Sequence, residues 1–278
     1  MRKLYLTKTA IRQASLFLVL ALITLITLIP IIWAAMLSFK LPADAFTIPP
    51  KIFFEPTLRF HQQIWGESQF PRYLLNSVIV CLGTVLISVP IGSLAAFSLS
   101  RMPKQLAQPI LLGIFSLRML PFMLLAIPFF VFGRWTGLID THWILILSLV
   151  AINQPFTIWL MYGFFEEIPR ELDEAAALDG CNAWQTFFHV VLPLVKPGIA
   201  VTSIFSIILA YNEFLLALIL TGERTRTLPV AIASFGGEDI TEWSRAAASA
   251  VGVMVPIIIV LILMQRQLVR GMTMGAVK

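Results

Sequence analysis

Long apolar runs alternate with short polar segments along the whole chain. A membrane-spanning helix needs about 20 predominantly apolar residues, and six runs meet this length. The first run exceeds the apolar core of a signal peptide, which has roughly 7–15 residues, so we expect it to be retained. The pattern predicts an all-α polytopic membrane protein. Residues 1–278 are expected to form one domain, which begins with a short tail at 1–12. The predicted spans are 13–39, 74–100, 107–132, 143–165, 197–220 and 246–265.

The composition supports a membrane protein. Hydrophobic residues make up 58% of the chain and charged residues only 13%, whereas a soluble domain is about a quarter charged. The net charge of +5 could indicate a nucleic-acid partner, but the basic residues cluster at the ends of apolar runs. We therefore expect them to set membrane topology, and we expect no nucleic acid among the partners.

Basic residues also predict the orientation of the spans. Arg101 and Lys104 lie between the second and third spans, and both terminal segments are basic and contain no acids. Their basic residues are Arg2, Lys3, Lys8 and Arg12 at the start and Arg266, Arg270 and Lys278 at the end. Cytoplasmic segments carry the excess of Lys and Arg, so both termini are expected in the cytoplasm. The same topology places the polar loop 166–195, between the fourth and fifth spans, on the cytoplasmic side.

The loop 166–195 begins with the pattern of a short acidic helix. Pro169 suits the first turn because its missing N–H needs no partner there, and acids near the start complement the helix dipole. These acids are Glu171, Asp173 and Glu174. Three alanines at 175–177 favour helix and give a surface without bulk. Gly180 is expected to end the helix because glycine accepts a positive φ.

A second short helix is predicted directly after Gly180. Asn182 can cap it, and Gln185 completes a capping-box pattern three residues later. Its apolar residues fall on one helical face: Trp184, Phe187, Phe188 and Val191. Leu192-Pro193 is expected to end this helix. The two helices would form an elbow whose alanine-rich arm docks into a groove on another protein.

Glu-Ala-Ala is followed after three residues by Gly, after nine more by an aliphatic residue, and after one further residue by Leu-Pro. The residues are Glu174, Ala175, Ala176, Gly180, Val190, Leu192 and Pro193. This spacing resembles the signature loop of permease subunits in binding-protein-dependent ABC importers. The resemblance implies a cytoplasmic coupling helix that seats in a cleft of a separate ATPase subunit. The implied coupling residues are Glu174, Ala175, Ala176, Asp179, Gly180, Leu192 and Pro193.

The same resemblance implies the partners: a second homologous permease, two ABC ATPase subunits and an extracytoplasmic solute-binding protein, assembled in the lipid bilayer of a prokaryotic plasma (inner) membrane. Further segments resemble the sugar-importing branch, and the C-terminal residues 271–278 resemble the maltose-transporter type. The segments that resemble the sugar-importing branch are 98–101, 118–121, 137–141, 162–165 and 211–214. A sugar or sugar-like solute (oligosaccharide, polyol or glycoside) is therefore implied. In related importers a loop at the position of 221–245 reaches into the binding protein.

Two charged residues lie inside predicted spans, Arg118 in the third and Glu213 in the fifth. A charge at the centre of a bilayer costs about 2.5–3.5 kcal/mol on insertion scales, so such residues usually face a bundle interior or a polar cavity. One interpretation is that a polar set lines the translocation path or a gate. This set is Asn153, Tyr211, Asn212 and Glu213. The other is that Arg118 and Glu213 neutralise each other or pair with another subunit.

Motifs for catalysis are missing from the sequence. The chain has no Gly-x-x-x-x-Gly-Lys-Ser/Thr loop and no Gly-x-Ser-x-Gly elbow, and its three histidines lack metal-ligand spacing. We therefore expect no enzyme activity, catalytic residue, metal site or cofactor here, with ATP and magnesium in the partner ATPase subunits. The alternative function is an ion-gradient-driven transporter or channel subunit. Such proteins often have internal repeats and several intramembrane carboxylates, whereas Glu213 stands almost alone.

Overall fold

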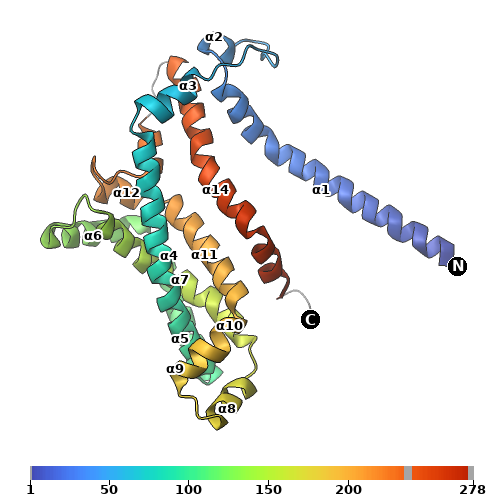
Figure 1. Cartoon of the computed structure of the whole chain (residues 1–278), viewed down its shortest axis with the longest axis vertical. Coiled ribbons are helices and arrows are strands. Elements are labelled where there is room, and N and C mark those ends of the chain that lie inside the picture. The colour runs from blue at the N-terminus through green and yellow to red at the C-terminus, as the bar shows by residue number, and fades with distance from the viewer. Residues whose placement is uncertain (1, 235–239, 275–278) are drawn as a thin grey trace. The chain divides into compact units, whose positions relative to one another are not determined.

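The computed structural model describes residues 2–234 and 240–274, with the backbone only for residues 2–11, 67, 240, 241 and 268–274. All regular structure in these ranges is helical, which confirms the predicted all-α fold class. By its internal contacts the chain falls into two compact units (Figure 1). The first is Met1–Ser68 with Phe235–Gly252, and the second is Gln69–Ser234 with Val253–Lys278. That the whole chain forms one transmembrane domain stays a prediction.

The first unit begins with helix α1 (Arg2–Ser38), which contains nearly all of the first predicted span. Large apolar side chains along it are exposed, from Leu16 to Trp33. No charged residue lies between Arg12 and Lys40, so α1 is long and apolar enough to cross a bilayer. Its exposed apolar surface suits contact with lipid or with a neighbouring membrane helix.

A buried lysine fixes the segment that follows α1. Lys40 is 1% exposed; its Nζ donates to the carbonyl oxygen of Lys51 at 2.6 Å and lies 5.0 Å from the ring centroids of Trp33 and Phe54. The carbonyl and the two ring faces compensate the buried charge. The short helical pieces of this proline-rich segment are α2 (Pro42–Ala45), α3 (Arg59–Gln62) and the π-turn η1 (Gln63–Glu67).

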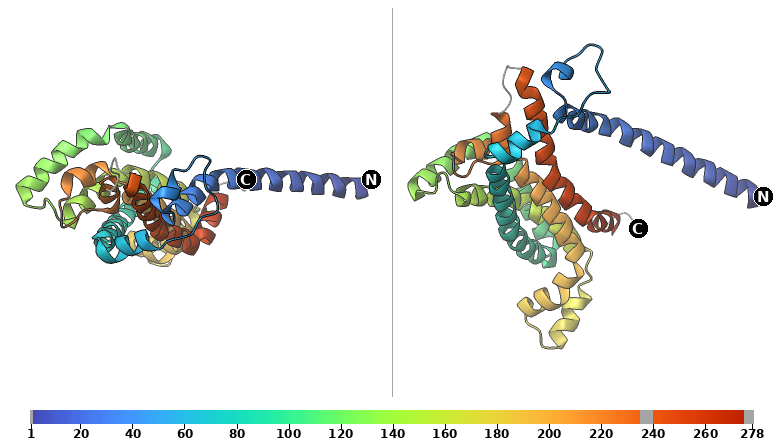
Figure 2. Two further views of the ribbon diagram at one scale, coloured as in Figure 1. Left: turned by 90° about the horizontal axis from the view of Figure 1, so that it is seen from above. Right: turned by 45° about the horizontal axis from the view of Figure 1, so that its top comes forward.

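Helices α4, α7 and α11 form the centre of the second unit. α4 (Phe70–Arg101) and α7 (His142–Glu166) contain the second and fourth predicted spans, and each is one continuous helix. α11 (Lys196–Tyr211) packs against both (Figure 2). Apolar side chains from α4, α5, α7 and residues 187–195 form a buried cluster at one end. Its members are Ala96, Leu99, Leu111, Ile158, Met161, Phe165, Phe187, Val191 and Val195.

The third predicted span, 107–132, is two helices rather than one straight helix. α5 (Lys104–Ser116) runs into a 3-10 turn, η2 (Leu117–Met119), and α6 (Phe122–Thr136) leaves at 86° to it. Pro121 accounts for the break, because the residue before a proline is pushed out of the helical region. Leu120 accordingly has an extended backbone, with ψ 130°. Together the two helices are long and apolar enough to count as one bent span.

The fifth predicted span, 197–220, is also interrupted. α11 ends at Tyr211, and α12 (Leu215–Leu220) follows after a break at 212–214. α13 (Leu228–Ala233) and α14 (Ile240–Met274) complete the described chain, and α14 contains the sixth predicted span. Four of the described helices are each long and apolar enough to cross a membrane. Two bent helix pairs also pass this test, and if each pair counts as one span the number rises to six. The fold is that of a multi-pass membrane protein, and the number of six spans stays a prediction.

Candidate functional site

The predicted acidic elbow is present, and its first arm is α8 (Glu171–Leu178). Acids occupy the first turn of this helix: Glu171, Asp173 and Glu174. Gly180 has φ +85°, and its N–H donates to the carbonyl oxygen of Ala177 at 3.0 Å, while the N–H of Cys181 donates to that of Ala176 at 2.9 Å. These two bonds form the Schellman helix end, which favours glycine at the left-handed position. The prediction that Gly180 ends the helix is confirmed.

The second arm starts with the predicted capping box. The Gln185 N–H donates to Asn182 Oδ1 at 2.9 Å, and the Asn182 N–H donates to Gln185 Oε1 at 2.8 Å. The prediction that Leu192-Pro193 ends this helix is off by one residue, because the helical run continues to Leu194 and Pro193 lies at a position where its missing N–H needs no partner. The chain turns only at Val195. The arm consists of α9 (Ala183–Gln185), the π-turn η3 (Thr186–Val191) and α10 (Leu192–Leu194).

The four apolar side chains of the second arm divide between two surroundings. Phe187 is 3% exposed and Val191 0%, and both belong to the buried cluster of the second unit. Trp184 is 61% exposed and Phe188 48%, and their rings stack with centroids 6.0 Å apart. The π-turn is wider than an α-turn, so the predicted single apolar face splits. One half anchors the elbow and the other remains available to a partner.

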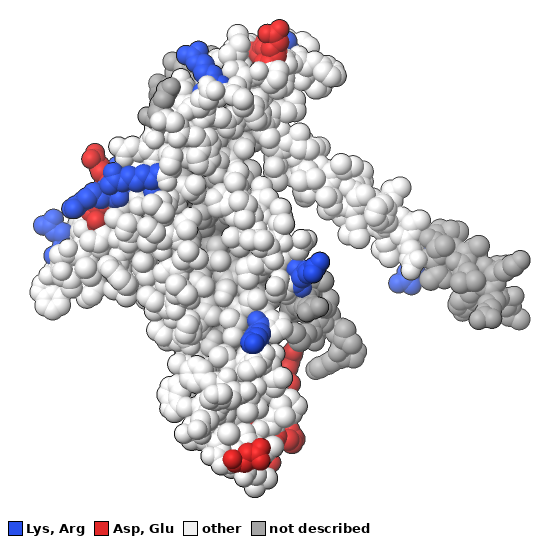
Figure 3. Space-filling model, in the orientation of Figure 1, with Lys and Arg blue, Asp and Glu red and all other residues white. Residues whose placement is uncertain are grey.

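The first arm exposes acidic side chains and two large apolar side chains, Leu172 at 37% and Leu178. Ala176 is 5% exposed because α8 packs against η3, so it is a contact within the elbow and not part of a docking face. Leu178, in contrast, is 90% exposed. Figure 3 shows Asp and Glu side chains gathered over α8 at this end of the second unit. Of the other predicted coupling residues, Glu174, Ala175, Asp179, Gly180 and Pro193 are exposed and Leu192 is half-buried.

Two arginines, which we call the arginine bracket, fasten the elbow to neighbouring helices. Arg101, the last residue of α4, donates from Nε and Nη2 to the carboxylate of Asp173 and from Nη1 to the carbonyl oxygen of Phe165 at 3.2 Å. The side chains of Arg101 and Asp173 are 17% and 22% exposed, so salt screens them less than a surface pair. Arg170 Nη2 donates to the carbonyl oxygens of Ser100 at 2.9 Å and Met102 at 3.1 Å. The bracket therefore ties α8 to the ends of α4 and α7.

Arg118 lies in η2, at the corner between α5 and α6. Its guanidinium carbon is 4.6 Å from the ring centroid of Phe156, and its buried Nη1 has no hydrogen-bond partner among the described residues. The ring face gives the cation partial compensation. The side chain borders a cavity of about 190 Å³ between this corner and α7. Other residues at the cavity include Phe122, Phe129, Ile152 and Pro155.

The four candidate path residues have different surroundings. Asn153 is buried in α7, and its Nδ2 finds no hydrogen-bond partner in the part of the chain that the structure describes, whereas Asn212 is exposed at the break after α11. The Tyr211 hydroxyl donates to the carbonyl oxygen of Val253 in α14 at 2.9 Å. Glu213 Oε1 accepts the N–H of Leu216 in the first turn of α12 at 3.0 Å, a donor that has no partner within that helix. Among the described side chains Glu213 forms no ion pair with Arg118, and a translocation role for the four stays a prediction.

The sequence pattern did not reveal the arginine bracket or the exposure of Leu178. The topology argument uses Arg101 only as a cytoplasmic charge, and its contact with Asp173 joins residues 72 positions apart. A signal for Leu178 does exist, because it is a large apolar residue directly before the Asp179-Gly180 helix end. A side chain at that position leaves the helix where no further turn can cover it.

Comparisons with known proteins agree with this geometry. A family model described as "Binding-protein-dependent transport system inner membrane component" matches residues 88–274. The trehalose/maltose transport system permease protein MalG of Thermococcus litoralis is 33% identical over 261 residues, which cover 92% of this chain and 94% of that protein. The trehalose transport system permease protein SugB of Mycobacterium tuberculosis is 34% identical over 274 residues, covering 96% and 98%.

The fold recurs in a solved structure. A chain in the crystal structure of a bacterial ABC transporter involved in the import of the acidic polysaccharide alginate superimposes with a TM-score of 0.72 at 22% identity, covering 92% of this chain and 96% of that chain. The family match covers well over half of the chain and includes the elbow, all of α7 and the end of α4 that holds the elbow. The chain belongs to the binding-protein-dependent transport system inner membrane components, the membrane permease subunits of ABC importers.

Proposed function

We propose that this permease subunit forms half of the translocation pathway of an ATP-driven importer for a sugar or sugar-like solute. The observation that carries the coupling role is the exposed elbow, whose acidic and apolar side chains are presented by a segment that the arginine bracket holds to α4 and α7. The names of the two relatives support the sugar class for this chain. An oligosaccharide, a polyol and a glycoside all fit this class.

In this proposal the elbow, residues 171–195, seats in a cleft of a separate ATPase subunit. ATP-driven closure of two such subunits moves the elbow, and the arginine bracket passes the motion to α4 and α7. Hydrolysis then resets the helices. Such a switch requires two packings of the spans that are close in energy, each favoured by different partners. ATP and magnesium belong to the ATPase subunits in this scheme.

The proposed assembly contains this chain, a second homologous permease, two ATPase subunits and an extracytoplasmic solute-binding protein. Six spans with both termini in the cytoplasm place the elbow on the side where ATP is available. The same topology places the connection between α12 and α13 outside, on the side of the binding protein. The membrane is a prokaryotic plasma membrane.

Purification of the tagged chain from its native membrane in mild detergent tests this proposal. Mass spectrometry should identify a homologous permease and an ABC ATPase in the complex. Reconstituted into liposomes with the solute-binding protein, the complex should hydrolyse ATP faster when its sugar is added from a panel of neutral, acidic and reduced sugars. Recovery of the chain without any ATPase would overturn the proposal.

Arg101→Met is expected to lower the amount of solute transported per ATP hydrolysed. The substitution leaves the carboxylate of Asp173 and the carbonyl oxygen of Phe165 without this donor, and hydrogen bonds to charged groups contribute about 1.5–3 kcal/mol each. Asp173→Asn should have a similar effect. The double variant should be no worse than either single variant, because both remove one shared contact. The measurement is the ratio of uptake to ATP hydrolysis in proteoliposomes.

Lys104→Met is the matched control for Arg101→Met. Lys104 forms an ion pair with Glu166 at 3.1 Å in the same region, but its side chain is 68% exposed. An exposed ion pair contributes at most about 1 kcal/mol, so the ratio should stay at the wild-type value. A wild-type ratio in Arg101→Met as well would show that the bracket does not transmit the motion.

A further inference from the structure

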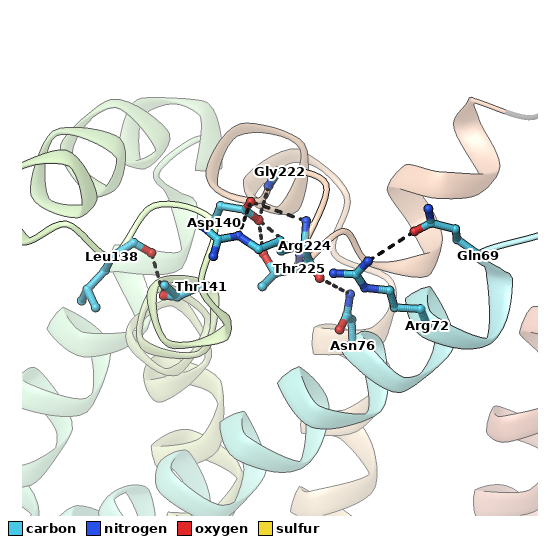
Figure 4. Close-up of polar contacts among 9 residues, drawn as sticks. All are labelled: Gln69, Arg72, Asn76, Leu138, Asp140, Thr141, Gly222, Arg224 and Thr225. Carbon is cyan, nitrogen blue, oxygen red and sulfur yellow. Dashed lines mark hydrogen bonds and ion pairs between the residues drawn. The ribbon is translucent and has the colours of Figure 1, made fainter.

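The carboxylate of Asp140 gathers hydrogen bonds from a segment more than 80 residues away along the chain. Asp140 lies in the turn between α6 and α7, and its Oδ1 accepts the N–H of Gly222 at 2.8 Å and both the N–H and the hydroxyl of Thr225, at 3.1 and 2.8 Å (Figure 4). Its Oδ2 accepts the N–H of Arg224 at 3.5 Å. In the opposite direction, the N–H of Asp140 donates to the carbonyl oxygen of Leu220 at 3.1 Å.

The first turns of α4 hold the rest of this segment. Asn76 Nδ2 donates to the carbonyl oxygens of Arg224 at 3.1 Å and Arg226 at 2.9 Å. Ser77 Oγ accepts the N–H of Leu228 at 2.8 Å. Asn76 and Ser77 are 4% and 2% exposed, so these bonds are made away from bulk water. Asn76 Oδ1 also lies 2.9 Å from Nε2 of His142, at the start of α7.

The close approach of Gly222 to Asp140 requires glycine. A Cβ built on Gly222 would lie 2.7 Å from Asp140 Oδ2, which is shorter than any normal contact. Asp140 itself has φ +57°, an uncommon conformation for a residue other than glycine. The contact between Asp140 and Gly222 thus depends on an uncommon backbone conformation at one residue and on the missing side chain of the other.

Asp140 is charged in this arrangement. Burial by itself would raise the pKa of its carboxyl group, but the hydrogen bonds from Thr225, Gly222 and Arg224 outweigh burial and lower the pKa below its ordinary value. The guanidinium of Arg224 lies 3.7 Å from Oδ2 with its side chain 80% exposed, and His142 is the other titratable group nearby. A carboxylate with a lowered pKa stabilises the folded state above its unfolded pKa, and this stabilisation is lost as the pH falls through the folded pKa.

We propose that Asp140 and Asn76 are positioning residues that make segment 222–228 move as one body with the adjoining ends of α4 and α7. The inference rests on the proposed function, in which this end of the helices faces the solute-binding protein. Segment 222–228 connects α12 to α13 and presents the exposed charges of Glu223 and Arg224. A binding protein that contacts this connection meets a preformed surface and acts directly on two central helices. Without Asp140 the same surface must be ordered during binding, and this cost lowers the affinity for the binding protein.

Asp140→Asn tests this role, because the variant keeps the size of the side chain but removes its charge and half of its acceptor capacity. In proteoliposomes containing the full complex, ATPase activity is measured against the concentration of the sugar-loaded binding protein. We expect the concentration for half-maximal stimulation to rise roughly tenfold, as for the loss of a charged hydrogen bond. A lower yield or melting temperature with an unchanged half-maximal concentration would overturn the proposal, because that is the result of a purely structural role.

Asp44→Asn is the matched control. Asp44 is a carboxylate of the segment between α1 and α4, which is also expected outside the membrane; there it pairs with Lys51 at 2.8 Å, and its loss should leave the half-maximal concentration unchanged. Thr225→Val removes one of the bonds to Asp140 and should give a smaller shift that does not add to that of Asp140→Asn. It also replaces Asp140→Asn in the test if that variant does not assemble. If no binding protein stimulates the wild-type complex, the proposed function fails; if stimulation is normal and neither variant shifts it, only the positioning role fails.

Discussion

Leu178→Glu is expected to abolish docking of the ATPase subunit while the chain still inserts into the membrane. Leu178 is 90% exposed at the end of α8, where it contributes little to the packing of this chain. Burial of a leucine in a partner's cleft contributes about 1.5–3 kcal/mol, which corresponds to roughly 10- to 100-fold in affinity. A glutamate in the same cleft adds the cost of an unpaired charge. Solute uptake should therefore be lost together with docking.

The amount of ATPase that co-purifies with the tagged chain measures this effect, with the amount of chain in the membrane as the reference. Phe53→Glu is the control: Phe53 is 91% exposed, but it lies in the segment between α1 and α4, which is expected on the opposite side of the membrane. This variant should retain the ATPase. Full retention in Leu178→Glu would show that the elbow does not bind through its exposed apolar residue.

Gly180→Pro is expected to uncouple transport through the direction of the elbow rather than through its surface. Gly180 has φ +85°, whereas proline is confined to about −65°. Proline also removes the N–H that donates to Ala177, and it disfavours the ψ of 2° that Asp179 has before it, since a residue before proline prefers an extended backbone. The two arms of the elbow must then meet at another angle. We expect uptake to fall roughly tenfold or more, as for misplacement of a coupled group by about 1 Å.

Gly180→Asn separates this geometric effect from the loss of glycine itself. Asparagine tolerates a positive φ better than other residues, and the space around a Cβ at Gly180 is free of other atoms within 4 Å. Uptake in Gly180→Asn should therefore stay close to the wild-type value at the same amount of protein in the membrane. Equal uptake in Gly180→Pro and Gly180→Asn would contradict the geometric explanation.

Local interactions explain why much of the elbow could be predicted from the sequence. The capping box of Asn182 and Gln185 and the helix end at Gly180 each involve residues within a few positions of one another, and their side-chain chemistry determines the backbone. The continuous helices α4 and α7 follow in the same way from uninterrupted apolar runs. The family resemblance, drawn from the elbow, is confirmed by the match over residues 88–274. It removes the alternative of an ion-gradient-driven transporter or channel.

Features that depend on distant contacts could not be predicted. The ion pair between Arg101 and Asp173 and the hydrogen bonds to the carboxylate of Asp140 join segments that are far apart in the sequence, and no local pattern indicates either contact. The apolar pattern does not predict the interruption at 212–214 either, because apolar residues continue on both sides of Glu213. At the corner between α5 and α6 the sequence does contain Pro121, but prolines are common in membrane helices. The proline alone does not say whether a span bends slightly or turns by 86°.

The length of α4 lets one helix connect two distant contacts within the second unit. Asn76 near its start holds segment 222–228, and Arg101 at its end holds the elbow, so one unbroken helix joins both contacts. At 1.5 Å per residue these side chains stand about 38 Å apart along the axis. If α4 tilts as a rigid rod about its middle by about 10°, each end moves by roughly 3 Å in opposite directions. Such a rigid tilt would convert a displacement of α4 on one face of the membrane into an equal and opposite displacement on the other face.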